Sequence, residues 1–313
     1  MRAVGLAGPG AGLQQLELEV PEPRPDELLV RVIASSINPV DAYIVNGTYG
    51  TGELSYPVVP GRDFCGVVER GADGFEPGDR VLGCWTVPEF QLGSWAQYLS
   101  VPLQSAVARW PDVLSAQEAA ALPLAAVTAQ LAIDALAPNA GETVLIVGAG
   151  GAVGCYAVQL AARRGARVIA TAKPEAEQRV RALGAAQTID YRRDDLLAAA
   201  RELCPGGVPV VFDIVNDKPE LLALAELVPA GGRVASARFA ADRRVLSGRG
   251  VTPINVIANG HGGAVLADVL AMAAAGALQV LVSDTRPLDA LPDAVQEFER
   301  GSAGKIVIEV EPA

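Results

Sequence analysis

A glycine-rich turn set between a strand and a helix constrains this chain more than any other feature of its sequence. The apolar run Thr143–Val147 indicates a buried strand, and Cys155–Arg164 indicates a helix. Glycines between them allow a tight turn, let a phosphate approach the backbone and let the helix pack on the strand. The helix N-terminus adds N–H donors and the positive end of its dipole. We therefore expect dinucleotide phosphates to bind at five residues of the turn: Gly148, Gly151, Ala152, Val153 and Gly154.

Strands that alternate with alanine-rich helical stretches surround this turn from about residue 115 onward. Such repeated βαβ units predict a doubly wound parallel sheet of the Rossmann type. The remaining strands of this part are expected at Arg167–Thr171, Gln187–Asp190, Val210–Val215, Arg233–Ala237 and Ile254–Ala258. A helical stretch at Leu288–Arg300 and a strand at Lys305–Val310 follow, and the pattern alone leaves open which sheet that strand joins.

Short β-rich runs separated by proline and glycine make up the first part of the chain, a texture typical of a small, partly open barrel or sandwich. These runs are Arg2–Leu6, Leu13–Val20, Leu28–Ile33, Gly66–Arg70, Arg80–Cys84 and Ala96–Val101. The chain is therefore expected to be an α/β protein with a β-rich domain ahead of the Rossmann domain.

The residues after the second Rossmann strand bear on which nicotinamide cofactor binds. NAD-binding proteins carry an acidic residue there to hold the ribose 2′-hydroxyl, whereas this chain has Thr171-Ala172-Lys173. The small residues leave room, and Thr171 is expected to contact the cofactor. Lys173 can meet a 2′-phosphate, with Tyr191 and the two arginines after it as further candidates. NADPH is therefore the expected cofactor. The alternative is that Lys173 and the arginine pair are solvated surface charges.

Composition argues against several classes of partner. The 313 residues carry a net charge of -11, and the acidic pI of about 4.7 disfavours nucleic acid and anionic membranes. The N-terminus lacks the apolar core of a signal peptide, and the most apolar window, Ala119–Ala137, contains Pro123 and Asp134 and indicates a buried helix. We expect a cytoplasmic protein that acts on a small molecule.

Few residues are suited to metal or nucleophilic chemistry. The single histidine, His261, lies in a glycine-rich loop, and the four cysteines are widely spaced. A Ser-His-Asp triad, a zinc cluster and a disulfide framework are therefore not expected. The cysteines are expected to be buried thiols.

Several motifs in a fixed order resemble the medium-chain dehydrogenase/reductase superfamily, and within it the zinc-independent quinone oxidoreductase branch. The likeness covers nearly the whole chain and rests on Ile37–Asp41 with Tyr43, Pro60–Val68, Gly78–Val81, Gly93–Tyr98, Leu122–Ala129, the glycine turn and Gly304–Val307. It implies a GroES-like catalytic domain at residues 1–117 and 257–313 and a Rossmann domain at residues 118–256. It also implies that the C-terminal strands rejoin the first domain and that two subunits pair through their sheet edges as a homodimer.

Zinc-dependent members of this superfamily hold their catalytic metal with a cysteine before the aspartate of the first block and a histidine after the glycine of the second. This chain has Ser35-Ser36-Ile37-Asn38 and Gly61-Arg62-Asp63 there. The four-cysteine lobe that binds structural zinc is missing too, so no metal site is expected. Two departures from the common pattern, Arg62 and Asn216-Asp217, leave the identity of the substrate open.

A reductase without zinc needs a substrate whose developing negative charge is spread out. Hydride delivered to a quinone, or to the C=C bond of an α,β-unsaturated carbonyl, produces an enolate-like oxygen that hydrogen-bond donors can stabilise. The resemblance implies Tyr49, Tyr43 and Asn38 as catalytic candidates, with Tyr49 as proton donor or orienting group. Cofactor contacts are implied for Asn38, Thr128 and Lys305. The alternative role of Tyr49 is a loop aromatic that shapes the site.

Two other functions stay open from sequence alone. A dedicated enoyl reductase for a polyketide-like or acyl-thioester substrate would use the same fold and chemistry. A catalytically idle NADPH-binding protein agrees less well with Asn38, Tyr43 and Tyr49, because a mere binder needs no donors at the nicotinamide end.

Overall fold

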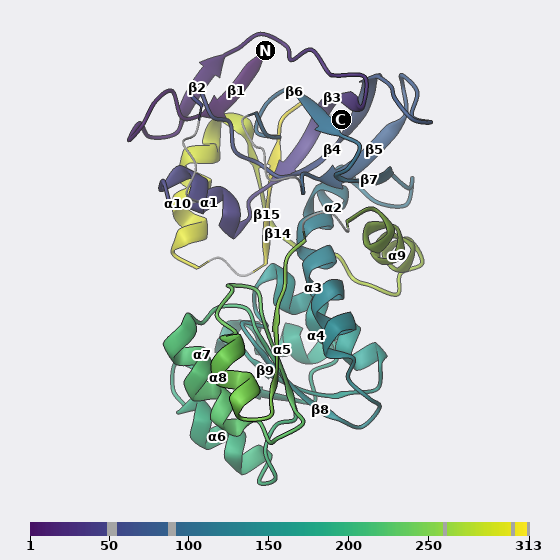
Figure 1. The fold of residues 1–313 in the computed structure, drawn as a ribbon. Coiled ribbons are helices and arrows are strands. Elements are labelled where there is room, and N and C mark those ends of the chain that lie inside the picture. Colours follow the sequence, from purple (N-terminus) through teal and green to yellow (C-terminus); the bar gives the residue numbers. More distant parts are fainter. Residues whose placement is uncertain (49–54, 87–91, 259–261, 302–303, 312–313) are drawn as a thin grey trace. The chain divides into compact units, whose positions relative to one another are not determined.

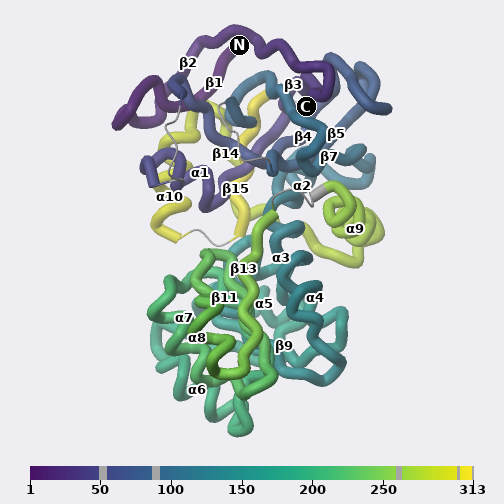
Figure 2. The backbone as a smooth tube through the Cα atoms, in the orientation of Figure 1, coloured from purple at the N-terminus to yellow at the C-terminus, as the bar shows by residue number. Residues whose placement is uncertain are grey.

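The computed structural model describes residues 1–48, 55–86, 92–258, 262–301 and 304–311 (Figure 1). Two compact units make up the chain, one formed by Met1–Ala125 with Ala258–Ala313 and the other by Ala126–Ile257. Figure 2 follows the backbone through the first unit, then the second, and back to the first. The domain borders predicted from the sequence lie between residues 117 and 118 and between residues 256 and 257. They stay a prediction.

The first unit is built on a mostly antiparallel seven-stranded sheet with the order β14-β15-β3-β4-β5-β7, in which β6 also pairs with β3. Its strands are β3 (Glu27–Ser36), β4 (Asp63–Arg70), β5 (Arg80–Cys84), β6 (Tyr98–Pro102), β7 (Ala106–Arg109), β14 (Val282–Pro287) and β15 (Lys305–Glu309). A separate two-stranded hairpin joins β1 (Arg2–Gly5) to β2 (Gln14–Glu17). Because β15 pairs antiparallel with β3, the last strand is part of this unit (Figure 1).

Strand β3 shows how sequence pattern produces both the core and a buried polar region. Leu28 and Val30 alternate with partly exposed neighbours and pack into a core that includes Trp95. The last five residues of the strand, Val32–Ser36, are all buried. Since this stretch ends in two serines, their hydroxyl groups need hydrogen-bond partners inside the protein.

Short helices complete the first unit. They are α1 (Pro39–Val45), α2 (Ala116–Ala121), α9 (Gly262–Ala274) and α10 (Leu291–Glu299), with a 3-10 turn η2 (Leu288–Ala290). Helix α2 begins with a capping box, in which the Ser115 and Glu118 side chains each accept the other's backbone N–H. Helix α3 (Pro123–Leu136) starts in this unit and continues into the second. Among the described residues, no helix has the length and apolar character needed to cross a bilayer.

The second unit is a six-stranded parallel sheet with the order β10-β9-β8-β11-β12-β13. Its strands are β8 (Thr143–Val147), β9 (Arg167–Thr171), β10 (Gln187–Ile189), β11 (Val210–Asp213), β12 (Arg233–Ser236) and β13 (Thr252–Asn255). The helical segments are α4 (Ala152–Arg163), α5 (Pro174–Ala182), α6 (Leu196–Leu203), α7 (Lys218–Leu224), η1 (Ala225–Leu227) and α8 (Arg243–Gly248). The strand order reverses between β8 and β11, the kind of switch point at which doubly wound sheets bind ligands. The predicted α/β fold with a Rossmann-type sheet is confirmed.

Two strands of the first unit were absent from the sequence-based expectation. Strand β7 has only four residues, and β14 is largely polar and half-exposed. Both stand at the ends of the sheet order. Edge strands are short or polar because this discourages pairing with other chains, so they lack the alternating apolar pattern that reveals a strand in sequence.

Candidate functional site

The glycine turn between β8 and α4 has a shape that requires glycine at two positions. Gly148 has a backbone φ of 91°, in the region that L side chains rarely adopt. A Cβ on Gly154 would lie 2.3 Å from the carbonyl oxygen of Gly148 and 2.5 Å from Cα of Ala149. Helix α4 therefore packs directly against the end of β8.

The open side of this turn fits a phosphate group. Helix α4 begins after Gly151, which provides no side-chain cap. Within the described residues, the N–H groups of Ala152 and Val153 make no hydrogen bond. The nearest atom to a Cβ built on Gly150 would be 3.6 Å away, and the nearest to one on Gly151 would be 3.5 Å away. The backbone is therefore accessible at both residues. Uncapped N–H groups at the positive end of a helix dipole suit the pyrophosphate of a dinucleotide.

Thr171, at the end of β9, holds the turn in place. Its buried Oγ1 accepts a hydrogen bond from the Gly148 N–H at 2.9 Å. Its carbonyl oxygen accepts another from the Ala149 N–H at 3.2 Å. The structure thus gives Thr171 a supporting role, and its predicted contact with the cofactor stays a prediction.

The predicted 2′-phosphate residues lie on the loops after β9 and β10. Lys173 is the half-buried N-cap residue of α5, and no acidic residue stands at the end of β9. Tyr191 is 46% exposed, and the two arginines after it approach acidic neighbours only to 3.9 Å. The two arginine side chains are therefore loosely held, which agrees with either of the two roles considered for them.

Arg179, on α5, also reaches the glycine turn, and sequence reasoning did not identify it. Its Nη2 donates to the Gly150 carbonyl oxygen at 3.1 Å. Residues three apart lie on one face of a helix, and Arg179 follows the buried Ala176 by that spacing. The spacing of Ala176 and Arg179 could be seen in the sequence. Only the packing of α5 shows that this helix face lies against the glycine turn.

In the first unit, the carboxylate of Asp63 is the centre of a buried polar network. Its Oδ2 accepts hydrogen bonds from Ser36 Oγ at 2.7 Å and Asn38 Nδ2 at 2.8 Å. The Lys305 ammonium lies 2.8 Å from the same oxygen and also donates to Asn38 Oδ1. The Leu124 N–H donates to Oδ1 of Asp63 at 2.8 Å. The structure therefore brings Asn38 and Lys305 together and fixes both ends of the Asn38 amide.

Asp41 is a second buried carboxylate beside this network. It accepts the Asn38 N–H at 2.8 Å and the Gly61 N–H at 3.1 Å. Burial raises the pKa of Asp41 to about 6, opposed by the Asn38 hydrogen bond and the charge of Arg62. The buried Arg62 guanidinium donates to the Trp85 carbonyl oxygen at 3.1 Å. A positive side chain thus stands where zinc-dependent members have a histidine.

The remaining predicted site residues are placed separately. Tyr43 is half-buried on α1, the helix that Asn38 caps. Thr128 is half-buried on α3, in the second unit. Tyr49 lies outside the described residues, and so does His261. The roles assigned to Tyr43, Tyr49 and Thr128 stay predictions.

Cysteine chemistry agrees with the sequence-based expectation. All four cysteines are free and buried. Burial raises the pKa of Cys65 to about 12 and that of Cys155 to about 11, so these thiols are protonated near neutral pH. In the part of the chain that the structure describes, no three His, Cys, Asp or Glu side chains are grouped to hold a metal ion.

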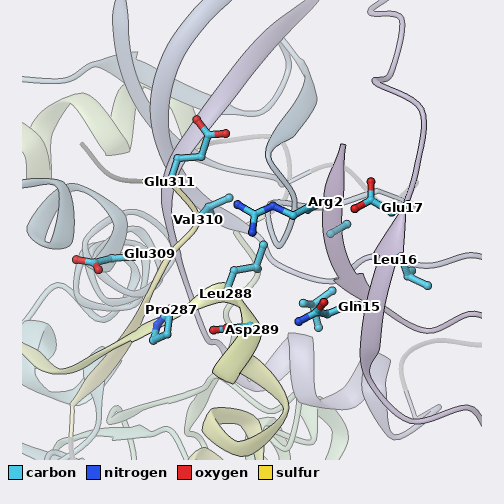
Figure 3. Close-up of a pocket in the computed structure, with 12 residues that line it drawn as sticks. Arg2, Gln15, Leu16, Glu17, Pro287, Leu288, Asp289, Glu309, Val310 and Glu311 are labelled. Atoms are coloured by element: carbon cyan, nitrogen blue, oxygen red, sulfur yellow. The ribbon is translucent and has the colours of Figure 1, made fainter.

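A cavity of about 360 Å³ opens in the first unit between the β1–β2 hairpin, η2 and β15 (Figure 3). Its charged lining residues are Arg2, Glu17, Asp289, Glu309 and Glu311. None of the predicted site residues lines it. We therefore base the candidate site on the glycine turn and the Asp63 network.

Comparison with known proteins establishes the family. Residues 24–112 match the "Alcohol dehydrogenase GroES-like domain" family, and residues 183–308 match the "Zinc-binding dehydrogenase" family. The "2-methylene-furan-3-one reductase" of Solanum lycopersicum is 31% identical over 306 residues, which cover 92% of this chain and 73% of that protein. The chain belongs to the medium-chain dehydrogenase/reductase superfamily. Its place is in the quinone oxidoreductase-like branch, as the sequence resemblance implied.

Other similar proteins are also named as oxidoreductases. The Arabidopsis thaliana "NADPH-dependent alkenal/one oxidoreductase, chloroplastic" is 32% identical over 240 residues, 72% of this chain. This chain spans 59% of the length of that relative and 61% of the Spinacia oleracea "Quinone-oxidoreductase homolog, chloroplastic".

Two solved structures resemble almost the whole chain. The quinone oxidoreductase from Coxiella burnetii has a TM-score of 0.89 at 26% identity, with 99% of both chains covered. A structure named as an NAD-dependent alcohol dehydrogenase has a TM-score of 0.86 at 31% identity and covers 99% of this chain and 100% of its own. These relatives are named as oxidoreductases, and the family to which this chain belongs binds a nicotinamide dinucleotide.

Proposed function

We propose that this chain is a zinc-independent, NADPH-dependent reductase that delivers hydride to a quinone or to the C=C bond of an α,β-unsaturated carbonyl. The observation that carries the proposal is the set of side chains at the positions of the zinc ligands. The block Ser35-Ser36-Ile37-Asn38 contains no cysteine, and the block Gly61-Arg62-Asp63 has the buried guanidinium of Arg62 and no histidine. Neither block offers the thiolate or imidazole that holds catalytic zinc.

The family name "Zinc-binding dehydrogenase" does not conflict with this proposal. Residues 183–308, which match that family, contain one cysteine, Cys204, and one histidine, His261. Catalytic zinc sites use three protein ligands, and structural sites use four. The match thus supports common descent and fold without supplying a ligand set.

The absence of zinc ligands bears on which substrates can react. Reduction of a saturated ketone places a full charge on one oxygen, which a metal would otherwise stabilise as a Lewis acid. An enolate or hydroquinone anion spreads its charge, so hydrogen-bond donors suffice, each contributing about 3 kcal/mol in a dry site. When bound, the reduced nicotinamide supplies the hydride.

The chain's own residues then orient the substrate and supply protons. Because Asp63 and Lys305 fix the Asn38 amide, its second N–H hydrogen keeps a constant direction. A donor held in this way needs no reorganisation when charge develops on a substrate oxygen. Tyr49 is our proposed proton donor, with Tyr43 as the alternative.

Two lines of support favour NADPH and a conjugated substrate. The end of β9 carries Lys173 where an NAD-specific protein has an acidic residue. One relative is named as NADPH-dependent, and two are named for unsaturated carbonyl compounds, the alkenal/one oxidoreductase and the 2-methylene-furan-3-one reductase. A structural neighbour is named as NAD-dependent, so the preference for NADPH rests on the residues after β9 and not on the fold.

A paired-substrate assay tests the proposal. With NADPH and a chelator present, we expect turnover of a quinone and of an enone, while the matching saturated ketone reacts at least about a hundredfold more slowly, a difference of about 2.7 kcal/mol. Enoyl thioesters are included because a dedicated enoyl reductase would prefer them. Equal turnover of ketone and enone, or loss of activity in chelator, would contradict conjugate reduction without zinc. No turnover of any substrate despite NADPH binding would indicate a catalytically idle protein.

A further inference from the structure

Arg179 lies on the side of the glycine turn that faces α5. It is half-buried, and its Nη2 donates to the Gly150 carbonyl oxygen at 3.1 Å. Its Nε is buried and has no hydrogen-bond partner within the described residues. On the same helix face, the Cβ of Ala176 lies 3.6 Å from a Cβ built on Gly150. The packing of α5 therefore keeps the guanidinium next to the turn.

Each carbonyl oxygen at the start of the turn has a hydrogen-bond donor of its own. The Gly148 oxygen accepts the N–H three residues further on, at 3.2 Å. The Ala149 oxygen accepts the Cys155 thiol at 3.3 Å. The Gly150 oxygen accepts Arg179. A carbonyl oxygen turned towards an anion would repel it. By binding the Gly150 oxygen, Arg179 holds the last of these three carbonyl groups, so that N–H groups are left for the ligand.

The charge of Arg179 acts on the first turn of α4. Burial raises the pKa of the Cys155 thiol to about 11, and the charge and hydrogen bond of Arg179 oppose that rise. Cys155 follows directly after the residues expected to bind phosphate. Since partly buried charges are screened less than exposed ones, the same guanidinium would attract a pyrophosphate at this turn.

We propose that Arg179 is a positioning residue for the dinucleotide pyrophosphate, which fixes the Gly150 carbonyl and adds positive charge to the phosphate-binding turn. This role is independent of the 2′-phosphate, which we assign to Lys173. It rests on the proposed binding of a nicotinamide dinucleotide at the turn.

The test measures binding of NADPH and NADH by fluorescence titration, so that it does not depend on turnover. Arg179→Met should weaken both nucleotides about tenfold and leave their ratio unchanged. Lys173→Ala should weaken NADPH and leave NADH unchanged. Arg181→Met is the matched control, because Arg181 is on the same helix but pairs with Glu177 at 2.9 Å. It should bind both nucleotides as the wild type does.

The outcomes separate this inference from the proposed function. A wild type that binds neither nucleotide contradicts dinucleotide binding itself. If the wild type binds and Arg179→Met binds equally well, or loses affinity for NADPH alone, the pyrophosphate role is wrong. Should Arg179→Met not fold, Arg179→Lys decides the question, because it keeps the charge without the forked donor. A smaller, equal loss for both nucleotides supports the role, and no loss contradicts it.

Discussion

The ammonium of Lys305 and the carboxylate of Asp63 lie 2.8 Å apart, and both side chains are almost completely buried. Removing one partner of such a pair leaves an uncompensated charge in a low-dielectric environment, which costs far more than the pair itself contributes. Asn38 and Ser36 also donate to this carboxylate. The stability of the first unit should therefore depend strongly on Lys305, whatever its role towards the cofactor.

We expect Lys305→Met to lower the free energy of unfolding by about 3–5 kcal/mol and the double variant with Asp63→Asn to recover part of it. The three tryptophans, Trp85, Trp95 and Trp110, all lie in the first unit, so their fluorescence in urea follows that unit. Arg286→Met is the control, because its pair with Glu297 lies in the same unit, is exposed and should contribute only about 0–1 kcal/mol. Equal losses in the two single variants would show that the buried pair is not strongly coupled.

Individual site residues could be predicted from the sequence where they belong to a motif. Residues whose role depends on packing between distant segments could not. The glycines of the turn could be predicted because their spacing follows from the strand and helix on either side. Asn38 and Lys305 were predicted as site residues from two family blocks, but their shared partner Asp63 was not, because the three residues come from distant parts of the chain. No local pattern predicts such a network, since only the sheet brings its members together.

At Gly154, helix α4 packs tightly on the turn that follows strand β8. A Cβ there would lie 2.3 Å from the Gly148 carbonyl oxygen, which is backbone and cannot rotate away. Gly154→Ala should therefore shift α4 away from β8, destabilise the second unit by about 1–3 kcal/mol and weaken NADPH binding. Circular dichroism in urea and a fluorescence titration measure the two effects.

Gly150→Ala is the matched control for this change. Its Cβ would meet Ala176 at 3.6 Å, an ordinary contact, so the free energy of unfolding should change by less than about 1 kcal/mol. The tryptophan transition of the first unit should stay unchanged in both variants. If Gly154→Ala unfolded at the same urea concentration as Gly150→Ala, the tight packing of α4 on β8 would be contradicted.

Elements were predicted most accurately where they are buried on both faces. Strands β8 and β9 have the predicted bounds, because parallel strands covered by helices form continuous apolar runs. Strands β7 and β14, at the ends of their sheet, could not be predicted in this way. These two strands form because they pair with a neighbouring strand, and their sequences lack the apolar pattern that would indicate a strand.

For the whole molecule, the order of the parallel sheet ends at β13, which contains Pro253. Proline is tolerated at such an edge, where a backbone donor can be absent. We propose that two subunits pair there, so light scattering should give twice 32.3 kDa at physiological salt. Each chain carries a net charge of -11, so repulsion should increase the monomer fraction at low ionic strength. A mass of 32.3 kDa in both conditions would contradict the dimer.

The position of β15 in the sheet affects how the polypeptide acquires its structure during synthesis. The second unit is one continuous segment, Ala126–Ile257, and can fold as soon as it has left the ribosome. The first unit must wait, because β3 lacks a neighbour and Asp63 lacks its counter-charge until Lys305 has been translated. During that interval the nascent chain exposes an unpaired strand edge, the kind of surface that chaperones recognise and that aggregates when left unprotected.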